Sequence, residues 1–367
     1  MEYVNLGDVA TYINGYAFKP EHRGKKGLPI IRIQDLNGNS HDLAFFDGKY
    51  PEQVEINTGD ILISWSGSLG VYKWNKGKAL LNQHIFKVLF NKIEIYKEYF
   101  CYAIRNSLSS MSQQTHGATM KHITKKDFDN ISIPYPDLIE QKKIANNLNI
   151  VNKLIMFYEK ELFLFEQMVK ARFIEMFGSI HNSKIFVYYP LKEITTVCSG
   201  GTPNRDNKAY WESGTIPWVK TTELKNNRLT HVEEFITELG LEESSAKLVP
   251  SDTVLVAMYG QGKTRGMTGY LEIEATTNQA CACILPTNKM NMIYLWKYFE
   301  LSYDKLRELA KGGNQPNLNC TMIRDFNILV PPIELQNQYA DFVRHVDKSR
   351  FDIKKSIIEL EREVVYD

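Results

Sequence analysis

The chain lacks the segments that would place it in a membrane or outside the cell. No apolar run reaches the roughly 18 residues that a membrane-spanning helix needs. Residues Met1 to Asn5 have neither the basic start nor the apolar core of a signal peptide. The five cysteines are scattered and odd in number, which argues for a reducing compartment. Cys281 and Cys283 have no second cysteine or histidine pair to complete a zinc site, so we expect a cytoplasmic protein without a metal.

The chain also lacks an excess of either charge. Its 44 lysines and arginines are balanced by 43 acidic residues, so the formal net charge is +1. Binding to a polyanion requires a basic patch rather than a basic total. Basic residues gather in segments that we predict as loops, at 19–26, 73–78, 121–126, 205–208 and 263–265. The composition is therefore compatible with a nucleic-acid partner.

No complete catalytic motif is present. Ala257–Thr264 resembles a phosphate-binding loop with alanine for its first glycine, but a turn into a strand is predicted next, where phosphate binding needs a helix N-terminus. Asp137 and Glu140 resemble the acidic residues of a PD…ExK nuclease motif, but at the predicted start of a helix we expect them to act as helix caps. Val330-Pro331-Pro332-Ile333 lacks the Asn or Asp of an adenine methyltransferase loop. We expect no catalysis and no cofactor.

What the chain does contain is a long internal repeat. Two segments of the chain, Asp127–Pro136 and Asp325–Pro332, each contain a predicted strand that ends at prolines. A long helical pattern follows each segment. The matches upstream, in the same order, are Leu6–Val9 with Leu191–Ile194, Gly15 with Gly200, Leu28–Arg32 with Ile216–Lys220, Gly59–Ile63 with Ser251–Leu255, Asn82-Gln83 with Asn278-Gln279, and His116–Ala118 with Gly312–Asn314. The offset drifts from 185 to 198 residues, which predicts insertions in surface loops. Such a repeat predicts two similar domains.

Each half is predicted to be a mixed α/β globule. The predicted strands include Ile61–Trp65, His84–Phe90, Thr253–Met258 and Ala280–Leu285, and a helix follows in each half, over Tyr96–Met111 and Met292–Lys311.

A long helix is predicted to follow each globule. The first begins at a cap on Asp137 and ends at Gly178. Its apolar residues alternate in steps of four and three, as in a coiled coil: Ile144, Leu148, Val151, Ile155, Tyr158, Leu162, Phe165 and Val169. The second seam is Leu335, Tyr339, Phe342 and Val346, then, after a skip, Ile353, Ile357, Leu360 and Val364. About 40 residues give a rod of ~60 Å, too long to dock on its own globule, so the two helices are predicted to pair antiparallel.

The ordered, duplicated set of motifs resembles the specificity subunits of type I restriction–modification systems over essentially the whole chain. The residues that carry the resemblance are Ile131–Pro136 with Glu140–Ile144, Ile328–Pro332 with Glu334–Gln336, Gly59–Ser64 with Gly67, Gly117–Ile123, and Gly312–Leu318.

The resemblance implies an α+β fold, with two mixed α/β target-recognition domains in a pseudo-twofold repeat, separated by two long antiparallel coiled-coil helices. The expected parts are recognition domain 1 (1–136), spacer helix 1 (137–179), recognition domain 2 (180–332) and spacer helix 2 (333–367). Each domain is expected to read one half of a bipartite, non-palindromic target in double-stranded DNA, with the helices setting the gap. Two methyltransferase subunits and restriction–translocase subunits would carry out catalysis, and the chain alone is expected to self-associate if it lacks them.

Candidate contacts follow from the side chains that read base edges or neutralise phosphates. The candidates for DNA in the first half are Arg32, Gln34, Trp65, Ser66, Ser68, Lys73, Trp74, Lys76, Thr119, Lys121 and His122. Those in the second half are Arg205, Lys220, Thr221, Thr222, Tyr259, Gln261, Lys263, Thr264, Arg265, Asn314, Gln315 and Asn317. Core packing is an equal alternative for Trp65 and Trp74. The candidates for docking of partner subunits are Lys142, Lys143, Asn146, Arg344 and Lys348.

Two alternative functions stay open at this point. A two-subunit type II restriction–modification system also joins two recognition domains in one specificity subunit, and the sequence does not separate the two. From another class, a coiled-coil scaffold would use its globules to bind protein. Retention on DNA or heparin that falls steeply with salt favours the DNA reader over the scaffold.

Overall fold

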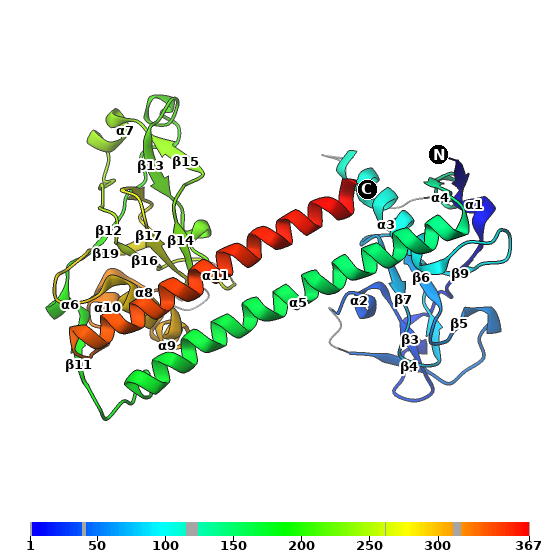
Figure 1. The fold of residues 1–367 in the computed structure, drawn as a ribbon, viewed down its shortest axis with the longest axis horizontal. Helices are drawn as coiled ribbons and strands as arrows, with labels where there is room; N and C mark the ends of the chain where they lie inside the picture. Colours follow the sequence, from blue (N-terminus) through cyan, green and yellow to red (C-terminus); the bar gives the residue numbers. More distant parts are fainter. Residues whose placement is uncertain (1, 39–41, 115–123, 261, 311–316, 367) are drawn as a thin grey trace. The chain divides into compact units, whose positions relative to one another are not determined.

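The structure is a computed structural model that describes residues 2–38, 42–114, 124–260, 262–310 and 317–366 (Figure 1). The chain forms two compact units. Unit 1 comprises Met1–Phe157 and Ile358–Asp367, and unit 2 comprises Tyr158–Ile357. A boundary between the units therefore lies within each long helix, and each unit is described by itself below.

Unit 1 contains two four-stranded sheets and a two-stranded ribbon. The first sheet has the strand order β2-β9-β6-β7, the second has the order β4-β3-β8-β5, and the ribbon pairs β1 with β10. The strands are β1 (Tyr3–Asn5), β2 (Thr11–Asn14), β3 (Leu28–Ile31), β4 (Ala44–Phe46), β5 (Glu55–Ile56), β6 (Ile61–Ser64), β7 (Gly70–Lys73), β8 (Ala79–Leu81), β9 (Ile85–Leu89) and β10 (Ser132–Pro134). The helices are α1 (Leu6–Val9), η1 (Pro20–His22), α2 (Ile33–Leu36), η2 (Glu52–Val54), α3 (Lys97–Gln114) and α4 (Lys125–Asp129).

Unit 2 repeats this arrangement with one strand more in its first sheet and one fewer in its second. The orders are β12-β19-β16-β17-β14, β15-β13-β18 and the ribbon β11-β20. The strands are β11 (Val187–Pro190), β12 (Val197–Ser199), β13 (Ile216–Val219), β14 (Asn227–Leu229), β15 (Glu234–Ile236), β16 (Val254–Ala257), β17 (Thr268–Leu271), β18 (Thr276–Thr277), β19 (Cys281–Ile284) and β20 (Asn327–Val330). The helices are α6 (Leu191–Ile194), η3 (Lys208–Tyr210), η4 (Thr221–Glu223), α7 (Glu238–Glu242), α8 (Met292–Leu301), α9 (Tyr303–Leu309) and α10 (Cys320–Arg324).

Matched hydrogen bonds confirm that the two units are copies. The backbone N–H of Leu6 donates to the carbonyl of Ile131 at 2.8 Å, and that of Leu191 donates to Phe326 at 3.0 Å. Both bonds close a short helix onto the strand of the ribbon. The four predicted strands lie within one residue of β6, β9, β16 and β19. The second predicted helix is broken in two, because α8 ends at Leu301 and α9 starts at Tyr303.

The structure corrects the alignment of the two copies at two places. The most similar letters, Asp127-Phe128 and Asp325-Phe326, are not equivalent: Phe326 accepts the Leu191 bond described above, as Ile131 does in unit 1, so the offset is 195 rather than 198. In the first sheet of each unit, Leu62 pairs with Lys87 and Leu255 pairs with Cys283. These pairings make Leu62 equivalent to Leu255, which shifts the predicted match of 59–63 with 251–255 by one residue.

The two long helices are α5 (Leu138–Phe177) and α11 (Ile333–Tyr366), drawn in green and in orange to red in Figure 1. The Oδ1 atom of Asp137 accepts the backbone N–H groups of Ile139 and Glu140 at 2.9 Å, which is the predicted cap. Gly178 ends α5 in the left-handed region at φ 79°.

In unit 2 the two helices pack antiparallel, as predicted. Tyr339 of α11 contacts Phe173 and Phe177 near the end of α5, whereas Arg350, further along α11, pairs with the earlier Glu166 at 2.9 Å. Arg350 is half-buried and lies between Val346 and Ile353, within the gap of the apolar seam. A polar residue in a coiled-coil seam fixes register at some cost in stability.

The same buried glutamine fastens the start of each long helix. Gln141 is fully buried, accepts the backbone N–H of Tyr96 at 2.9 Å and donates to the Pro136 carbonyl at 2.8 Å. In unit 2, Gln336 accepts from Asn291 at 3.0 Å and donates to Pro331 at 2.7 Å.

Candidate nucleic-acid interface

In unit 1, two parallel strands bring polar residues to one edge. Strands β3 and β8 pair in parallel, so their carboxyl ends meet at the same side of the sheet. The backbone N–H of Asn82, just past β8, donates to the carbonyl of Ile31 at 3.0 Å, which places Asn82 beside Arg32. The β6–β7 hairpin joins them, because the N–H of Trp65 donates to His84 at 3.2 Å.

Unit 2 builds the same edge from β13 and β18, which also pair in parallel. The N–H of Asn278 donates to the carbonyl of Val219 at 3.0 Å, so Asn278 lies beside Lys220. The β16–β17 hairpin is attached through the N–H of Met258, which donates to Ala280 at 2.8 Å. The strand-end edge is named here for residues 32–34, 65–69 and 82–84 of unit 1 and residues 220–222, 258–260, 262–267 and 278–280 of unit 2.

A glycine allows the edge to close in each unit. A Cβ atom on Gly15 would lie 2.0 Å from the carbonyl oxygen of Asn82, and one on Gly200 would lie 2.1 Å from the Oγ1 atom of Thr277. Real Cβ atoms do not approach other atoms this closely, so both positions require glycine. The two glycines, predicted as equivalent from the sequence, have the same role.

Lys220 on the edge of unit 2 and the neighbouring Arg205 are held by acids and aromatic rings. The Nζ atom of Lys220 lies 2.8 Å from Glu233 and 2.9 Å from Glu234, and these hydrogen bonds raise the pKa of Lys220. Arg205 pairs with Glu234 as well, and its guanidinium lies 3.7 Å from the ring centroid of Trp211. Arg205 and Lys220 therefore form one network around a shared carboxylate.

The equivalent cation of unit 1 is held in a similar way. The Nε atom of Arg32 lies 3.0 Å from Asp35, and the backbone N–H of Arg32 donates to the same carboxylate at 2.8 Å. In unit 2 the backbone N–H of Lys220 donates to Glu223, also at 2.8 Å. Gln34 and Thr222, each the third residue after its strand, are exposed beside these cations.

The unit 1 hairpin is short and packed at its base. The Nε1 atom of Trp65 donates to Asn14 at 3.3 Å, and its ring stacks on Phe86 at 5.5 Å between centroids. Ser66 is 9% exposed, whereas Ser68 at the tip is exposed. Trp65 thus combines half-buried packing with a place on the strand-end edge.

The unit 2 hairpin is longer and is braced by helix α9. Tyr303 donates to the carbonyl of Lys263 at 2.7 Å, and Arg307 donates to that of Arg265 at 2.8 Å. The side chains of Tyr259 and Lys263 remain exposed, and that of Thr264 is half-buried. Strand β17 follows directly, which confirms the predicted turn into a strand and removes the helix that a phosphate loop needs. The N–H of Leu318 donates to Met258 at 3.0 Å and brings Asn317 to the base of the hairpin.

Comparison with known proteins decides the family. The sequence profile described as "Type I restriction modification DNA specificity domain" matches residues 1–162 and again residues 184–362. The chain belongs to this family. It is 24% identical to the type I restriction enzyme EcoBI specificity subunit of Escherichia coli, over 96% of this chain and 81% of that protein. It is also 24% identical to the type I restriction enzyme MjaVIII specificity subunit of Methanocaldococcus jannaschii, over 94% of this chain and 86% of that protein.

Two solved structures share the fold of this specificity subunit. The crystal structure of the type I restriction–modification S subunit from M. genitalium superposes with a TM-score of 0.58 at 16% identity, over 99% of this chain and 93% of that one. A structure from work on complex assembly and conformational transition of the type I system gives 0.56 at 15% identity, over 99% and 95%. The predicted family and the α+β fold with two repeats and two long helices are thereby confirmed.

Three predicted DNA contacts lie away from the strand-end edge. Lys73 pairs with Ile61 at the opposite end of the β6–β7 pair, and its Nζ atom lies 3.1 Å from Glu98. Lys76 follows in the exposed turn before β8. Trp74 is 6% exposed in the core of the second sheet, and its Nε1 atom donates to Gly77. For Trp74 the structure therefore corrects the DNA-contact prediction in favour of core packing.

Six predicted contacts fall outside the described residues: Thr119, Lys121, His122, Gln261, Asn314 and Gln315. The five predicted partner contacts are all exposed on the long helices: Lys142, Lys143, Asn146, Arg344 and Lys348. Among them Lys143 lies 3.4 Å from Glu140, and Arg344 pairs with Asp341.

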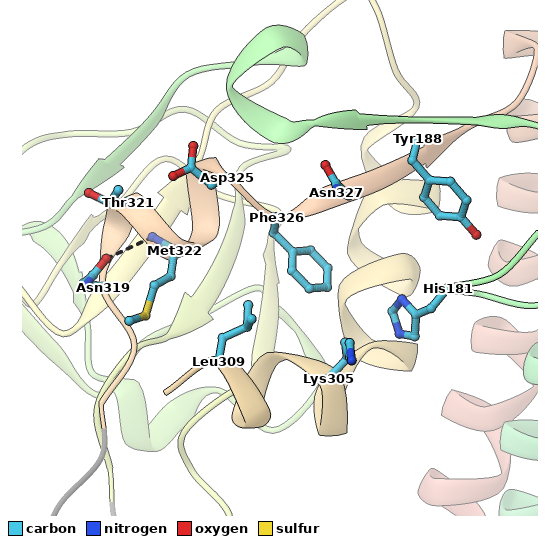
Figure 2. Close-up of a pocket in the computed structure, with 10 residues that line it drawn as sticks. All are labelled: His181, Tyr188, Lys305, Leu309, Asn319, Thr321, Met322, Asp325, Phe326 and Asn327. Atoms are coloured by element: carbon cyan, nitrogen blue, oxygen red, sulfur yellow. Dashed lines mark hydrogen bonds between the residues drawn. The ribbon is translucent and has the colours of Figure 1, made fainter. Parts of the chain in front are cut away.

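A separate hollow lies in unit 2 near the ribbon. Its volume is 780 Å³, and its lining includes His181, Tyr188, Lys305, Asp325 and Phe326 (Figure 2). Burial and the nearby Lys305 lower the pKa of His181. A similar hollow of 480 Å³ in unit 1 is lined by residues such as Tyr3 and Ile131, so it accompanies the shared fold.

The described residues contain neither a membrane-spanning helix nor a metal-binding cluster. No helix there is long and apolar enough to cross a membrane. No three histidine, cysteine or acidic side chains in that part of the chain are grouped as metal ligands would be. Cys281 and Cys283 are buried in the core of unit 2.

Sequence reasoning missed one pair of residues on the edge. Asn82-Gln83 and Asn278-Gln279 lie between the two sheets at the same place in both units. The signal that could have identified them is the recurrence of the same dipeptide in both copies.

Proposed function

We propose that this specificity subunit reads a bipartite, asymmetric target in double-stranded DNA, one half with the strand-end edge of each unit. The observation that carries the proposal is that the two edges share one construction and differ in their side chains. Ile33 and Gln34 in unit 1 correspond to Thr221 and Thr222 in unit 2. The hairpin runs between Ser64 and Gly70 in unit 1 but between Ala257 and Thr268 in unit 2.

The edge supplies both kinds of contact that specific DNA recognition needs. Phosphate contacts position a protein, and contacts to base edges specify the sequence. Exposed Lys263 suits a phosphate, whereas Gln34 and Thr222 carry groups that read base edges. Arg205 and Lys220 are oriented by the network around Glu234, which reduces the side-chain freedom lost on binding.

The long helices serve as spacer and docking site in this proposal. Two methyltransferase subunits bind the exposed faces that carry Lys142, Lys143 and Asn146 on α5 and Arg344 and Lys348 on α11. These subunits and the restriction–translocase subunits perform the chemistry, and the chain itself is not catalytic. The support is that the relatives above are named specificity subunits of type I restriction enzymes.

The test is methylation mapping. The chain is co-expressed with its cognate methyltransferase subunit in a host without methylation, and the methylated positions are read genome-wide. The proposal predicts one motif made of two unlike half-sequences and a fixed gap. A single continuous motif, or methylation without sequence preference, would overturn it. Binding of the purified complex to a DNA fragment that carries the motif should weaken steeply between 50 and 200 mM salt, by the roughly 10³-fold or more of proteins with many phosphate contacts.

A further inference from the structure

The dipeptide Asn-Gln occurs at the same position of both strand-end edges. Residues 82–84 form the whole link between β8 and β9, and residues 278–280 form that between β18 and β19. In each link the glutamine is the central residue and is exposed. Each link passes from one sheet of its unit to the other, next to the hairpin and the first cation of the edge.

The side chains of the dipeptide are not needed for the backbone of the link. The N–H groups of Asn82 and Asn278 bond to the preceding parallel strand at 3.0 Å, and any residue except proline could make these bonds. The N–H of Gln83 likewise bonds to Tyr16 at 3.0 Å. The backbone therefore fixes the position of the pair, and the Oε1 atom of Gln279 also accepts a hydrogen bond from the hydroxyl of Thr202.

The asparagine carries an unusual feature in both units. The Oδ1 atoms of Asn82 and Asn278 are buried and have no hydrogen-bond partner among the described residues. Leaving a buried acceptor without a donor weakens a fold. A purely structural role gives no reason to repeat the same uncompensated amide in two otherwise divergent edges.

We propose that Gln83 and Gln279, each exposed at the same position of its edge, make the same base contact in the two halves of the target. The base is adenine, because a side-chain amide presents one donor and one acceptor that match N7 and the N6 amino group in the major groove. The neighbouring residues differ between units and account for the unlike parts of the half-sequences. This inference rests on the proposed function and assigns one base contact of each half-sequence to a named glutamine.

The test uses the complete methyltransferase with Gln83→Ala, Gln279→Ala and the double variant. Asn75→Ala, in the exposed turn at the opposite end of β8, is the control. Gln83→Ala should relax one A·T position of one half-sequence, by the roughly 5- to 150-fold that one bidentate contact provides. Gln279→Ala should relax one position of the other half, and the double variant both. Asn75→Ala should leave the motif unchanged.

A second variant separates a base contact from a phosphate contact. Gln83→Glu offers only acceptors, so it should disfavour adenine and favour cytosine at the same position. A uniform loss of methylation with an unaltered motif, for Gln83→Ala and Gln83→Glu alike, would overturn the inference. If the wild-type complex shows no bipartite motif, the proposed function fails first. If the wild type is bipartite and both glutamine variants keep its motif, only this inference fails.

Discussion

The buried glutamine at the start of α5 gives a prediction whose size follows from the contacts. Gln141→Leu keeps the volume but leaves the N–H of Tyr96 and the carbonyl of Pro136 without their partners at 2.9 and 2.8 Å. A buried group left without a partner costs about 1–3 kcal/mol. Gln141 is 0% exposed, so water does not replace the bonds, and we expect local destabilisation of about 2–4 kcal/mol.

The assay is hydrogen exchange of the Tyr96 amide in the full chain, which reports local opening. The expected loss of protection is about 30- to 700-fold. Lys142→Leu, one residue away and exposed, should change stability by no more than about 0.5 kcal/mol. Unchanged protection of Tyr96 in Gln141→Leu would refute the assigned bond.

The repeat makes the same prediction for unit 2. Gln336→Leu should expose the amide of Asn291, which donates to Gln336 at 3.0 Å, by a similar factor. Each variant should leave the amide of the other unit unchanged, since the two glutamines share no hydrogen-bond partner. An equal loss of protection at both amides in either variant would show that the starts of the two helices are not independent.

Three further predictions concern the length of the spacer helices, the ion pair that joins α11 to β14, and the cysteines. Deleting residues 159–165 and 351–357 together shortens both helices by about 10.5 Å, so the mapped gap should shrink by about 3 base pairs with both half-sequences kept; an altered half-sequence would contradict the spacer role. Arg228→Met removes the 2.9 Å ion pair between β14 and α11 and should destabilise unit 2 by about 2 kcal/mol in urea unfolding followed by circular dichroism, whereas no change would show the pair to be neutral. A hydrogen bond from Cys283 lowers the pKa of Cys198, so its thiolate forms at lower pH than in an ordinary cysteine. Alkylation of Cys198 by iodoacetamide should therefore reach half its maximal rate below about pH 8.5, and Cys283→Ala should raise that midpoint.

The repeat and its elements were predictable because their signals are local. Short β-branched runs between glycine, proline and asparagine defined β6, β9, β16 and β19 to within one residue. Asp137 and Gly178 defined both ends of α5. The alignment of the two copies was not predictable at 127–136. The similar dipeptides Asp127-Phe128 and Asp325-Phe326 are offset by three residues from the structurally equivalent acceptors Ile131 and Phe326.

The strand-end edge depends on pairing that is distant in the sequence. β3 and β8 pair in parallel although about 50 residues separate them, and no local pattern predicts which strands meet in this way. Lys73 and Trp74 are close to Trp65 in the sequence, yet strand β7 runs from the hairpin turn to the opposite end of the sheet, where Lys73 ends the strand and Trp74 follows. The skip in the α11 seam was visible, but only the pairing of Arg350 with Glu166 explains it.

The central claim is that each unit reads one half of the target, and one measurement addresses it directly. Gln34 and Thr222 are exposed and lie at the third position after equivalent strands. The methylated motif is mapped for the wild-type complex and for Gln34→Ala and Thr222→Ala. The account predicts that Gln34→Ala changes one half-sequence only and that Thr222→Ala changes the other, with the gap constant. Changes in the same half, or in both halves at once, would contradict it.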